Sequence, residues 1–565
     1  MEHRYQEQME FYYSEKLSID SYKGIHLLPD HIGTSYGAPW DDYGYEIKFQ
    51  VYLVDAGKKR KIGNIRLLVH DETTTSKHLK KEGEQVESKV YIITNVLDRE
   101  SAISLPMSIN FYSKLHKLFK PNDVETILST LCDASYYYSH INEYQDWPGF
   151  QGALLREGSK SEAILKKGIH IANGRYEPEK TFEVTLENIK DTFEDVNLHF
   201  NTERTLGVTN INLLIGENGV GKTHVLKYLS DVFTGLTNSE VKLPFFHKLI
   251  VVSYSPFDTF NTQKQLMKKF DEKYEIETKK KKREFRLKRK KLNVNEYAYI
   301  GFRNDDGEFE LNLPIEHSVD SLLKIIEYDL ENSWWDEDTR LSILKETLSK
   351  SIAFDTLALD TTDGERITIG NFSKTAFKNL KGRVDKSKGI TFMSGETVTQ
   401  LSSGQQIYSY MLPAITAEIE DESLIIIDEP ELYLHPSLEV GLLDMLKYLL
   451  AETKSYAVVA THSAVIAREV ERKSVSILKK QDGITTCSKP SFETYGESIE
   501  LIMGEVFDDF FTDKPYQKAI DDLIDDENTP ESLAEELGSS MGDEALAYVL
   551  SKSVDNDFDF DDEDE

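Results

Sequence analysis

Short apolar runs, polar turns and stretches of helical periodicity divide this chain into parts with different patterns. In the first 180 residues, apolar and polar positions alternate at 45–55, and further apolar stretches at 62–71 and 89–97 predict more strands. Helical spacing follows at 108–139. We therefore expect residues 1–180 to form an α+β domain, whose residues show no recognisable catalytic triad or metal-ligand cluster.

From residue 181 the pattern changes to strands that alternate with helices, which predicts an α/β domain over residues 181–504. Short strands are expected at 182–186, 196–200 and 211–215, and the last leads directly into a glycine-rich loop. Residues 271–395 are polar with helical spacing, and we expect them to form a helical insertion. The helical spacing and many acidic residues of 505–565 predict an acidic helix followed by an acidic tail.

Composition favours a cytoplasmic protein with several domains. The 565 residues include only two cysteines, and no run of about eighteen apolar residues predicts a membrane span. A formal net charge of −33 argues against general nucleic-acid binding. The exception is the basic run at 279–291, which begins at Lys279, ends at Lys291 and holds ten Lys or Arg residues and one Glu. A solvated helix or loop and a clamp for a nucleic-acid backbone explain that run equally well.

The glycine-rich loop has the spacing of a phosphate-binding loop, G-x-x-x-x-G-K-T, between a buried strand and a helix. Its glycines let backbone N–H groups curl around phosphates, its lysine reaches the β and γ oxygens, and its threonine hydroxyl offers a ligand to Mg²⁺. The sequence thus predicts bound ATP with Mg²⁺. The loop comprises Gly216, Glu217, Asn218, Gly219, Val220, Gly221, Lys222 and Thr223.

Two adjacent carboxylates follow the four apolar residues 424–427, which predict a strand buried on both faces. Ligands bind at the C-terminal ends of such strands, so Asp428 is expected to hold Mg²⁺ through water. Glu429 is then placed to take the proton of the water that attacks the γ-phosphate. The alternative is that both carboxylates only cap the helix after Pro430, which leaves their proximity to a phosphate loop unexplained.

Two further motifs complete the pattern. His462 follows another apolar strand at 456–460; a lone histidine there is commonly structural, but after a phosphate loop we favour a sensor of the γ-phosphate. The stretch "LSSGQQ", which starts at Leu401, opens like an element that holds phosphate at a helix N-terminus. Since the chain already has a phosphate loop, this second element needs a separate explanation.

In this order, "GENGVGKT", "LSSGQQ", "IIIDEPELYLHP" and "ATHS" resemble the motifs of ABC-type ATPases, in particular the branch that includes the SMC, RecF and OLD families. The resemblance covers about 181–504. It implies a P-loop NTPase fold with a mixed sheet and flanking helices, a D-loop at residues 434–436 and a switch histidine at His462. It also implies a signature in which Ser402, Gly404 and Gln405 contact nucleotide. Gln263 lies where the family's Q-loop glutamine is expected.

In this family the signature of one subunit closes over the nucleotide of the other, which explains the second phosphate-holding element and implies a homodimer. A narrower likeness is to the ATPase subunits of Septu and retron-associated anti-phage systems, which implies a separately encoded nuclease or other effector as partner. The alternative is a RecF-like repair ATPase that acts directly on DNA. A transporter subunit is disfavoured by the large first domain.

Overall fold

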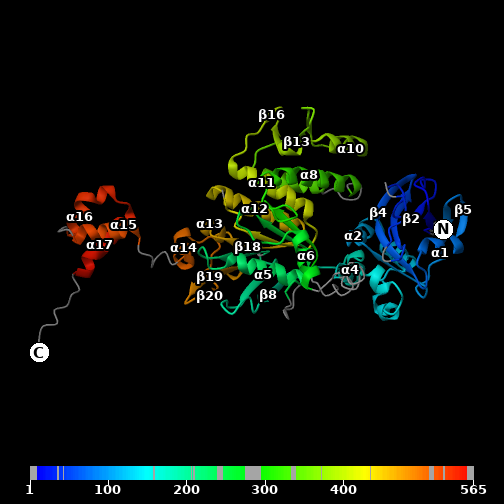
Figure 1. Cartoon of the computed structure of the whole chain (residues 1–565), viewed down its shortest axis with the longest axis horizontal. Helices are drawn as coiled ribbons and strands as arrows, with labels where there is room; N and C mark the ends of the chain where they lie inside the picture. The colour runs from blue at the N-terminus through cyan, green and yellow to red at the C-terminus, as the bar shows by residue number, and fades with distance from the viewer. Residues whose placement is uncertain are drawn as a thin grey trace, which may run out of the picture. The chain divides into compact units, whose positions relative to one another are not determined.

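The computed structural model describes residues 9–34, 37–41, 44–156, 159–204, 206–207, 210–237, 246–273, 294–332, 339–370, 372–432, 434–507, 514–525 and 529–556. Two compact units are present, Met1–Glu497 and Ser498–Glu565 (Figure 1). The basic run at 279–291 lies outside the described residues. No described helix is long and apolar enough to cross a membrane.

The first 180 residues are built on a seven-stranded sheet in the order β5-β6-β1-β2-β3-β4-β7. Apolar side chains on one face of this sheet pack against helices, because the strands alternate inward apolar and outward polar positions. The strands are β1 (Phe11–Ser14), β2 (Gly24–Pro29), β3 (Lys48–Asp55), β4 (Lys58–Val69), β5 (Glu84–Glu87), β6 (Val90–Ile92) and β7 (Ala102–Pro106). The helices are α1 (Thr75–Glu82), α2 (Asn110–Leu118), α3 (Pro121–Thr130) and α4 (Ser159–Ala172).

The central sheet of the second half is mixed, with the strand order β12-β11-β17-β18-β10-β19-β20. All neighbouring strands are parallel except β19 and β20. These strands are β10 (Ile211–Ile215), β11 (Phe246–Ser253), β12 (Val294–Gly301), β17 (Leu424–Asp428), β18 (Tyr456–Thr461), β19 (Val475–Gln481) and β20 (Ile484–Ser488). A separate hairpin is formed by β8 (Thr181–Leu186) and β9 (Val196–Asn201). The predicted α/β fold of P-loop type is confirmed.

The strand register places the C-terminal ends of β10, β17 and β18, where the predicted site residues lie, at one edge of this sheet. Ile215, the last residue of β10, is paired with Thr461 of β18, and Asp428 of β17 is paired with Ala460. The phosphate loop, the two carboxylates and His462 therefore leave the sheet side by side. The flanking helices are α5 (Lys222–Thr234), α6 (Gln263–Lys273), α11 (Ser403–Glu418), α12 (Pro436–Glu452) and α13 (Ala464–Ala467).

The segment expected to be a helical insertion contains strands as well as helices. Its β12 joins the central sheet beside β11, and a four-stranded sheet has the order β14-β13-β15-β16. Sequence reasoning did not identify β12 because it closely follows the basic run and has Asn295 and Glu296 near its start. The elements are α8 (Leu313–Asn332), α9 (Arg340–Ser349), β13 (Thr356–Asp360), β14 (Arg366–Thr368), α10 (Lys374–Arg383), β15 (Ile390–Ser394) and β16 (Thr397–Val398). In Figure 1, α8 lies between this small sheet and α11.

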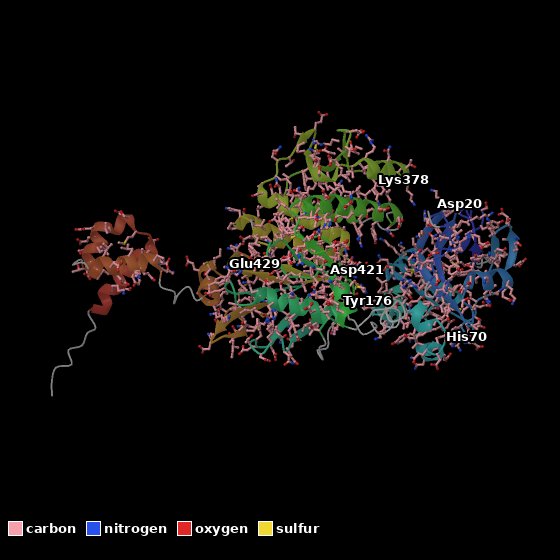
Figure 2. All side chains as sticks on the ribbon, in the orientation of Figure 1. Asp20, His70, Tyr176, Lys378, Asp421 and Glu429 are labelled. Atoms are coloured by element: carbon pink, nitrogen blue, oxygen red, sulfur yellow. The ribbon has the colours of Figure 1, made fainter. Side chains whose placement is uncertain are left out.

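Buried polar contacts join the first domain to the central sheet. Glu422, just before β17, accepts a hydrogen bond from the Lys167 ammonium at 2.8 Å and from the Tyr176 hydroxyl at 2.9 Å. Figure 2 shows Tyr176 next to Asp421 at this border, with Glu429 further into the second domain. On α8, Asn332 accepts from Lys114 of α2 at 2.8 Å. The first 180 residues thus make an ionic contact with the segment before β17 and a polar contact with α8.

The second compact unit is helical and has its own small core of Ile520, Leu533 and Val549. Its helices are α14 (Ile499–Phe507), α15 (Pro515–Asp525), α16 (Pro530–Leu537) and α17 (Asp543–Asn556). The expected domain boundary at 504/505 falls inside α14, whereas the compact units divide after Glu497. The difference arises because α14 continues the apolar spacing across the expected boundary.

Candidate functional site

The phosphate loop connects β10 to α5 with a backbone that glycine permits. Gly216 has φ +155° and Gly221 has φ +104°. A Cβ at Gly216 would lie 2.2 Å from the carbonyl oxygen of Leu478, and one at Gly221 would lie 2.5 Å from the Phe193 ring. Larger residues are excluded at both positions, so the loop keeps its backbone N–H groups free to face a ligand at the start of α5.

Lys222, the first residue of α5, is only 5% exposed. Its ammonium donates to the carbonyl oxygens of Gly216 and Glu217, each at 3.0 Å. Burial lowers the pKa of Lys222 to about 8, while the nearby Glu429 carboxylate opposes that effect. A partly desolvated cation inside a glycine loop is suited to pairing with phosphate oxygens.

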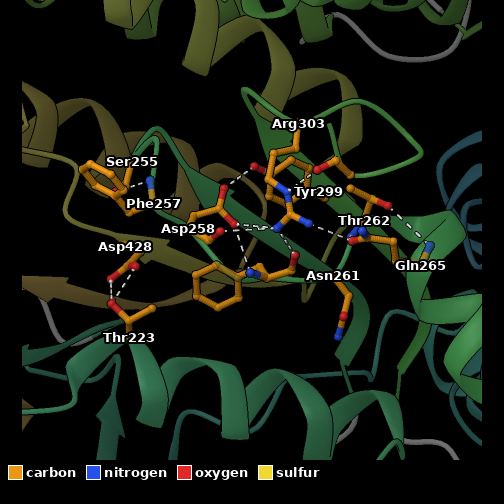
Figure 3. Close-up of polar contacts among 12 residues, drawn as sticks. Thr223, Ser255, Phe257, Asp258, Asn261, Thr262, Gln265, Tyr299, Arg303 and Asp428 are labelled. Carbon is orange, nitrogen blue, oxygen red and sulfur yellow. Dashed lines mark hydrogen bonds and ion pairs between the residues drawn. The ribbon is translucent and has the colours of Figure 1, made fainter. Parts of the chain in front are cut away.

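Thr223 and Asp428 meet beside Lys222. The Thr223 hydroxyl donates to the two Asp428 carboxylate oxygens at 2.9 and 3.2 Å (Figure 3). Burial raises the pKa of Asp428 to about 7, since its side chain is almost completely enclosed. Within the described ranges, no group of three or more His, Cys, Asp or Glu side chains could hold a metal ion. A hydroxyl and one carboxylate fit Mg²⁺, which keeps several waters and completes its shell with phosphate oxygens.

Glu429 and His462 form a close pair at the same edge. The Glu429 Oε1 atom lies 2.9 Å from Nε2 of His462, and this hydrogen bond lowers the pKa of Glu429. The Lys222 Nζ atom lies 2.8 Å from Nε2 and 3.2 Å from Nδ1 of the same ring. Glu429 also has φ +47°, a left-handed conformation that is uncommon for a non-glycine residue. Strain of this kind occurs where the surrounding structure fixes a functional side chain.

Glu431 was missed by sequence reasoning, although it lies only two residues after Glu429. Its Oε1 atom accepts hydrogen bonds from the Thr461 hydroxyl at 2.8 Å and from the His462 backbone N–H at 2.5 Å. The neighbouring Ser463 hydroxyl donates to Glu439 on α12. Glu431 therefore holds the backbone at His462, and Glu439 holds the side chain of the next residue. The only sequence signal for Glu431 was an additional acidic residue in the motif.

A second network lies behind the Thr223–Asp428 pair, as Figure 3 shows. The fully buried Asp258 accepts from the Tyr299 hydroxyl at 2.5 Å and from the Arg303 guanidinium at 3.2 Å. Arg303 also donates to the side chain of Gln265 at 2.9 Å. Gln263, the expected Q-loop residue, is exposed at the start of α6 and is not part of this network.

The expected signature residues do not join the phosphate loop of their own chain. Ser402 is the N-cap of α11: its hydroxyl accepts from Gln405 N–H at 3.3 Å, and the Gln405 side chain accepts from Ser402 N–H at 3.0 Å. Gln405 also donates to the carbonyl oxygen of Ser351 at 3.0 Å. Ser402 is exposed and Gly404 is buried. This is a capping box, in which each partner satisfies a free N–H group of the helix start.

These features define the fold class of the domain: an α/β fold of P-loop type, with a phosphate loop after β10 and paired carboxylates at the end of β17. Residues 211–468 match the family described as "AAA domain, putative AbiEii toxin, Type IV TA system". Protein ea59 of Escherichia phage lambda is 24% identical to this chain over 550 residues, or 92% of this chain and 94% of that protein.

Solved structures with detectable similarity include ATPase heads and cassettes. An SmcHead bound to the C-winged helix domain of ScpA is 13% identical, with a TM-score of 0.31, and the match covers 56% of this chain and 98% of that chain. The ADP conformation of an ATP-binding cassette of an ABC transporter is also 13% identical, with a TM-score of 0.27 and coverage of 59% and 100%. These scores are low, so the fold is assigned from this chain's own strand order and loops.

Proposed function

We propose that this protein binds ATP with Mg²⁺ and hydrolyses it to ADP and phosphate. The observation that carries this proposal is the convergence of five side chains at one edge of the central sheet. There Lys222 and Glu429 are each within hydrogen-bond distance of His462, and Thr223 donates to Asp428. Lys222 exchanges its carbonyl partners for β and γ phosphate oxygens. Thr223 and Asp428 would hold Mg²⁺, and a metal ion there would neutralise charge that develops on the phosphate oxygens.

Glu429 is the proposed general base. Its pKa is lowered, so the carboxylate is ionised at neutral pH and accepts the proton of the attacking water. The His462 ring, now 2.9 Å from Glu429, orients that carboxylate and senses the γ-phosphate. The His462 ring also lies 2.8 Å from the Lys222 ammonium, and a bound ATP would compete for that ammonium through its phosphate oxygens.

The proposed functional form is a homodimer in which Ser402 and Gly404 of one subunit close over the ATP of the other. This is supported by the exposed position of Ser402 at a helix N-terminus and by the lack of hydrogen bonds from its capping box to the loop, among the described residues of the chain. Closure would transmit ATP occupancy to a separately encoded effector, for which we propose a nuclease in anti-phage defence. The toxin–antitoxin description of the matching family supports a role in such conflicts.

Two substitutions test the hydrolytic site. Lys222→Ala is expected to abolish ATP binding, because it removes the only loop cation, whereas Lys227→Ala on the same helix serves as the control. Glu429→Gln is expected to keep ATP binding and to hydrolyse at least about a hundredfold more slowly. Equilibrium binding and phosphate release measure both effects. Normal ATP affinity in Lys222→Ala, or near-normal turnover in Glu429→Gln, would overturn the assignment.

A further inference from the structure

The sheet of the first domain has a second face that is polar and basic, although it is partly buried. On β3 and β4, Phe49 and Ile65 are paired and contribute to the apolar core, whereas the neighbouring pair Lys48 and Arg66 is on the opposite face. Arg66 is only 2% exposed, and Gln50, on the same face, is 5% exposed. This face therefore carries buried polar and cationic side chains, and the Gln50 amide is held by backbone carbonyl oxygens.

A cavity of about 560 Å³ lies over this face. That volume is within the range of small-molecule sites, roughly 300–1,000 Å³. The segment after β2 forms its wall, because the Gln50 amide donates to the carbonyl oxygens of Asp30 at 3.1 Å and Ile32 at 2.8 Å. Trp40 N–H donates to the Asp30 carboxylate at 3.2 Å and closes the wall. These contacts fix the cavity before any ligand enters.

The charges that line this cavity favour an anion. Its cationic side chains are those of Lys48, Lys61, Arg66 and Arg156, and its acidic ones are those of Asp30 and Asp41. Both carboxylates already accept backbone N–H groups of the wall, from Trp40 and Gly44 respectively. Among the lining residues that the structure describes, the positive charges exceed the negative charges by two, which matches a phosphate monoester, with about −1.5 to −2 charges at pH 7.

Independent support comes from Lys61 and from His31. Burial lowers the pKa of Lys61; the Glu331 carboxylate opposes that effect, and the ammonium groups of Lys374 and Lys48 add to it. The Lys48 ammonium also lies 4.0 Å from the Asp30 carboxylate. The Nδ1 atom of His31 is buried and has no hydrogen-bond partner among the described residues. His31 also lines the cavity, so this nitrogen is available to a ligand.

An aromatic ring at the rim adds a second element of recognition. The Trp40 side chain is 50% exposed, and the Arg156 guanidinium lies 5.8 Å from its ring centroid. A half-exposed indole beside a cation offers a stacking surface for a flat base next to a phosphate-binding group. Basic side chains deep in the cavity and an aromatic ring at its mouth are together the chemistry that recognises a nucleotide.

We propose that this cavity, at Lys48, Lys61, Arg66, Trp40 and Arg156, binds a nucleoside 5′-monophosphate group. The group is held by its phosphate on the basic face of β3 and β4 and by its base on Trp40. It comes either from a free nucleotide or from the 5′-phosphorylated end of a nucleic-acid strand. This site is separate from the ATP loop and shares no residue with it.

The test is calorimetric titration of the full-length protein with AMP and with inorganic phosphate. Lys48→Gln and Lys61→Gln are each expected to weaken the binding of both probes about tenfold, because each removes a charge-assisted hydrogen bond. Trp40→Ala is expected to weaken AMP binding but not phosphate binding. The control Lys58→Gln changes an exposed lysine on the same strand and should leave both affinities unchanged.

Lys222→Ala separates this proposal from the ATP site, because AMP binding at the cavity must survive that substitution. Loss of AMP binding in Lys222→Ala together with normal binding in Lys48→Gln and Lys61→Gln would overturn the proposal. Oligonucleotides with and without a 5′-phosphate identify the source. Binding of AMP indicates a free nucleotide, and binding of the 5′-phosphorylated oligonucleotide alone indicates a strand end. Equal binding of both oligonucleotides, or no binding of any probe, would refute the site.

Discussion

Three carboxylates within four residues have different properties because each has different neighbours. Burial raises the pKa of Asp428 to about 7, so its charge is stabilised only when a cation arrives. The His462 hydrogen bond lowers the pKa of Glu429 and keeps it ionised. Burial raises the pKa of Glu431, which receives backbone and hydroxyl hydrogen bonds instead of a cation. Asp428 therefore suits a metal ligand, Glu429 suits a general base, and Glu431 suits a residue that positions His462.

Glu431→Ala is expected to lower kcat of ATP hydrolysis about tenfold or more with little change in KM, since it frees the backbone of His462 but leaves the phosphate loop intact. Glu431→Gln keeps an oxygen that accepts from Thr461 and His462, and should restore most of the lost activity. Steady-state kinetics of both variants provide the comparison. An equal rise in KM, or no rescue by glutamine, would show that Glu431 supports only the fold.

Asp133 provides a pH test in the core of the first domain. It accepts from the Tyr112 hydroxyl and from Tyr136 N–H, each at 2.9 Å, yet burial raises its pKa to about 7. The folded state therefore holds this proton more tightly than the unfolded state, and the stabilising contribution is present below about pH 4 and lost as pH rises to about 7.

Asp133→Asn removes this titration. Relative to the unmodified protein, we expect the variant to gain stability as pH rises, by about 4 kcal/mol at most between pH 4 and 8. Thermal unfolding at both pH values measures the relative shift. A variant whose Tm differs from that of the unmodified protein by the same amount at both pH values would contradict the buried-carboxyl explanation.

The roles of some residues around the phosphate loop could be predicted from the sequence, and the roles of others could not. Lys222 begins the helix after the loop that follows β10, and Asp428 ends β17. Both strands pair with β18, and this register brings the loop and the carboxylate to the same edge of the sheet. The role of Glu431 depends on a hydrogen bond to a segment thirty-one residues later, and no local pattern encodes it. The Asp258–Arg303 pair spans forty-five residues and was missed for the same reason.

Among the secondary-structure elements, the strands that are buried on both faces were the ones that the sequence predicted best. Strands β10, β17 and β18 are continuous apolar runs, because both faces of a parallel sheet are covered, and each was predicted within a residue or two. Strand β12 lies at the edge of the sheet, begins with polar residues and pairs only with β11, so its composition did not distinguish it from a loop.

The element that carries the expected signature shows why sequence could not settle its role. Helix α11 starts with a capping box at Ser402, which many ordinary helices also use. Its far end is tied to α8, since Glu418 accepts from Lys324 at 2.6 Å. Helix α8 in turn contacts α2 of the first domain through Asn332 and Lys114. A movement of α11 on ATP closure would therefore reach the first domain through α8.

At the scale of the whole molecule, the contacts between the two domains could not be read from sequence. Glu422 looks like one of many surface carboxylates, yet it is buried and paired with Lys167, which is 255 residues away in the chain. The same limit applies to assembly. One chain contains both a phosphate loop and the expected signature, and the proposal that they act together concerns two copies of the chain.

Mixing two inactive variants tests that assembly. If each site takes its loop from one subunit and its signature from the other, Ser402→Arg and Lys222→Ala are both inactive as homodimers. In a mixed dimer, one site carries both lesions. The other joins the intact loop of the Ser402→Arg chain to the intact signature of the Lys222→Ala chain, and should hydrolyse ATP.

Phosphate release after subunit exchange is the measurement, and exchange is verified by the mixing of two differently labelled chains. Random exchange at equal concentrations makes half of the dimers mixed, each with one of two sites intact, so about a quarter of wild-type activity is expected if sites act independently. The matched control pairs Lys222→Ala with Glu429→Gln, two lesions on the loop side. Its mixed dimers have no intact site and should stay inactive. Exchange without recovered hydrolysis in the first mixture, or normal hydrolysis by Ser402→Arg alone, would mean that "LSSGQQ" only starts a helix.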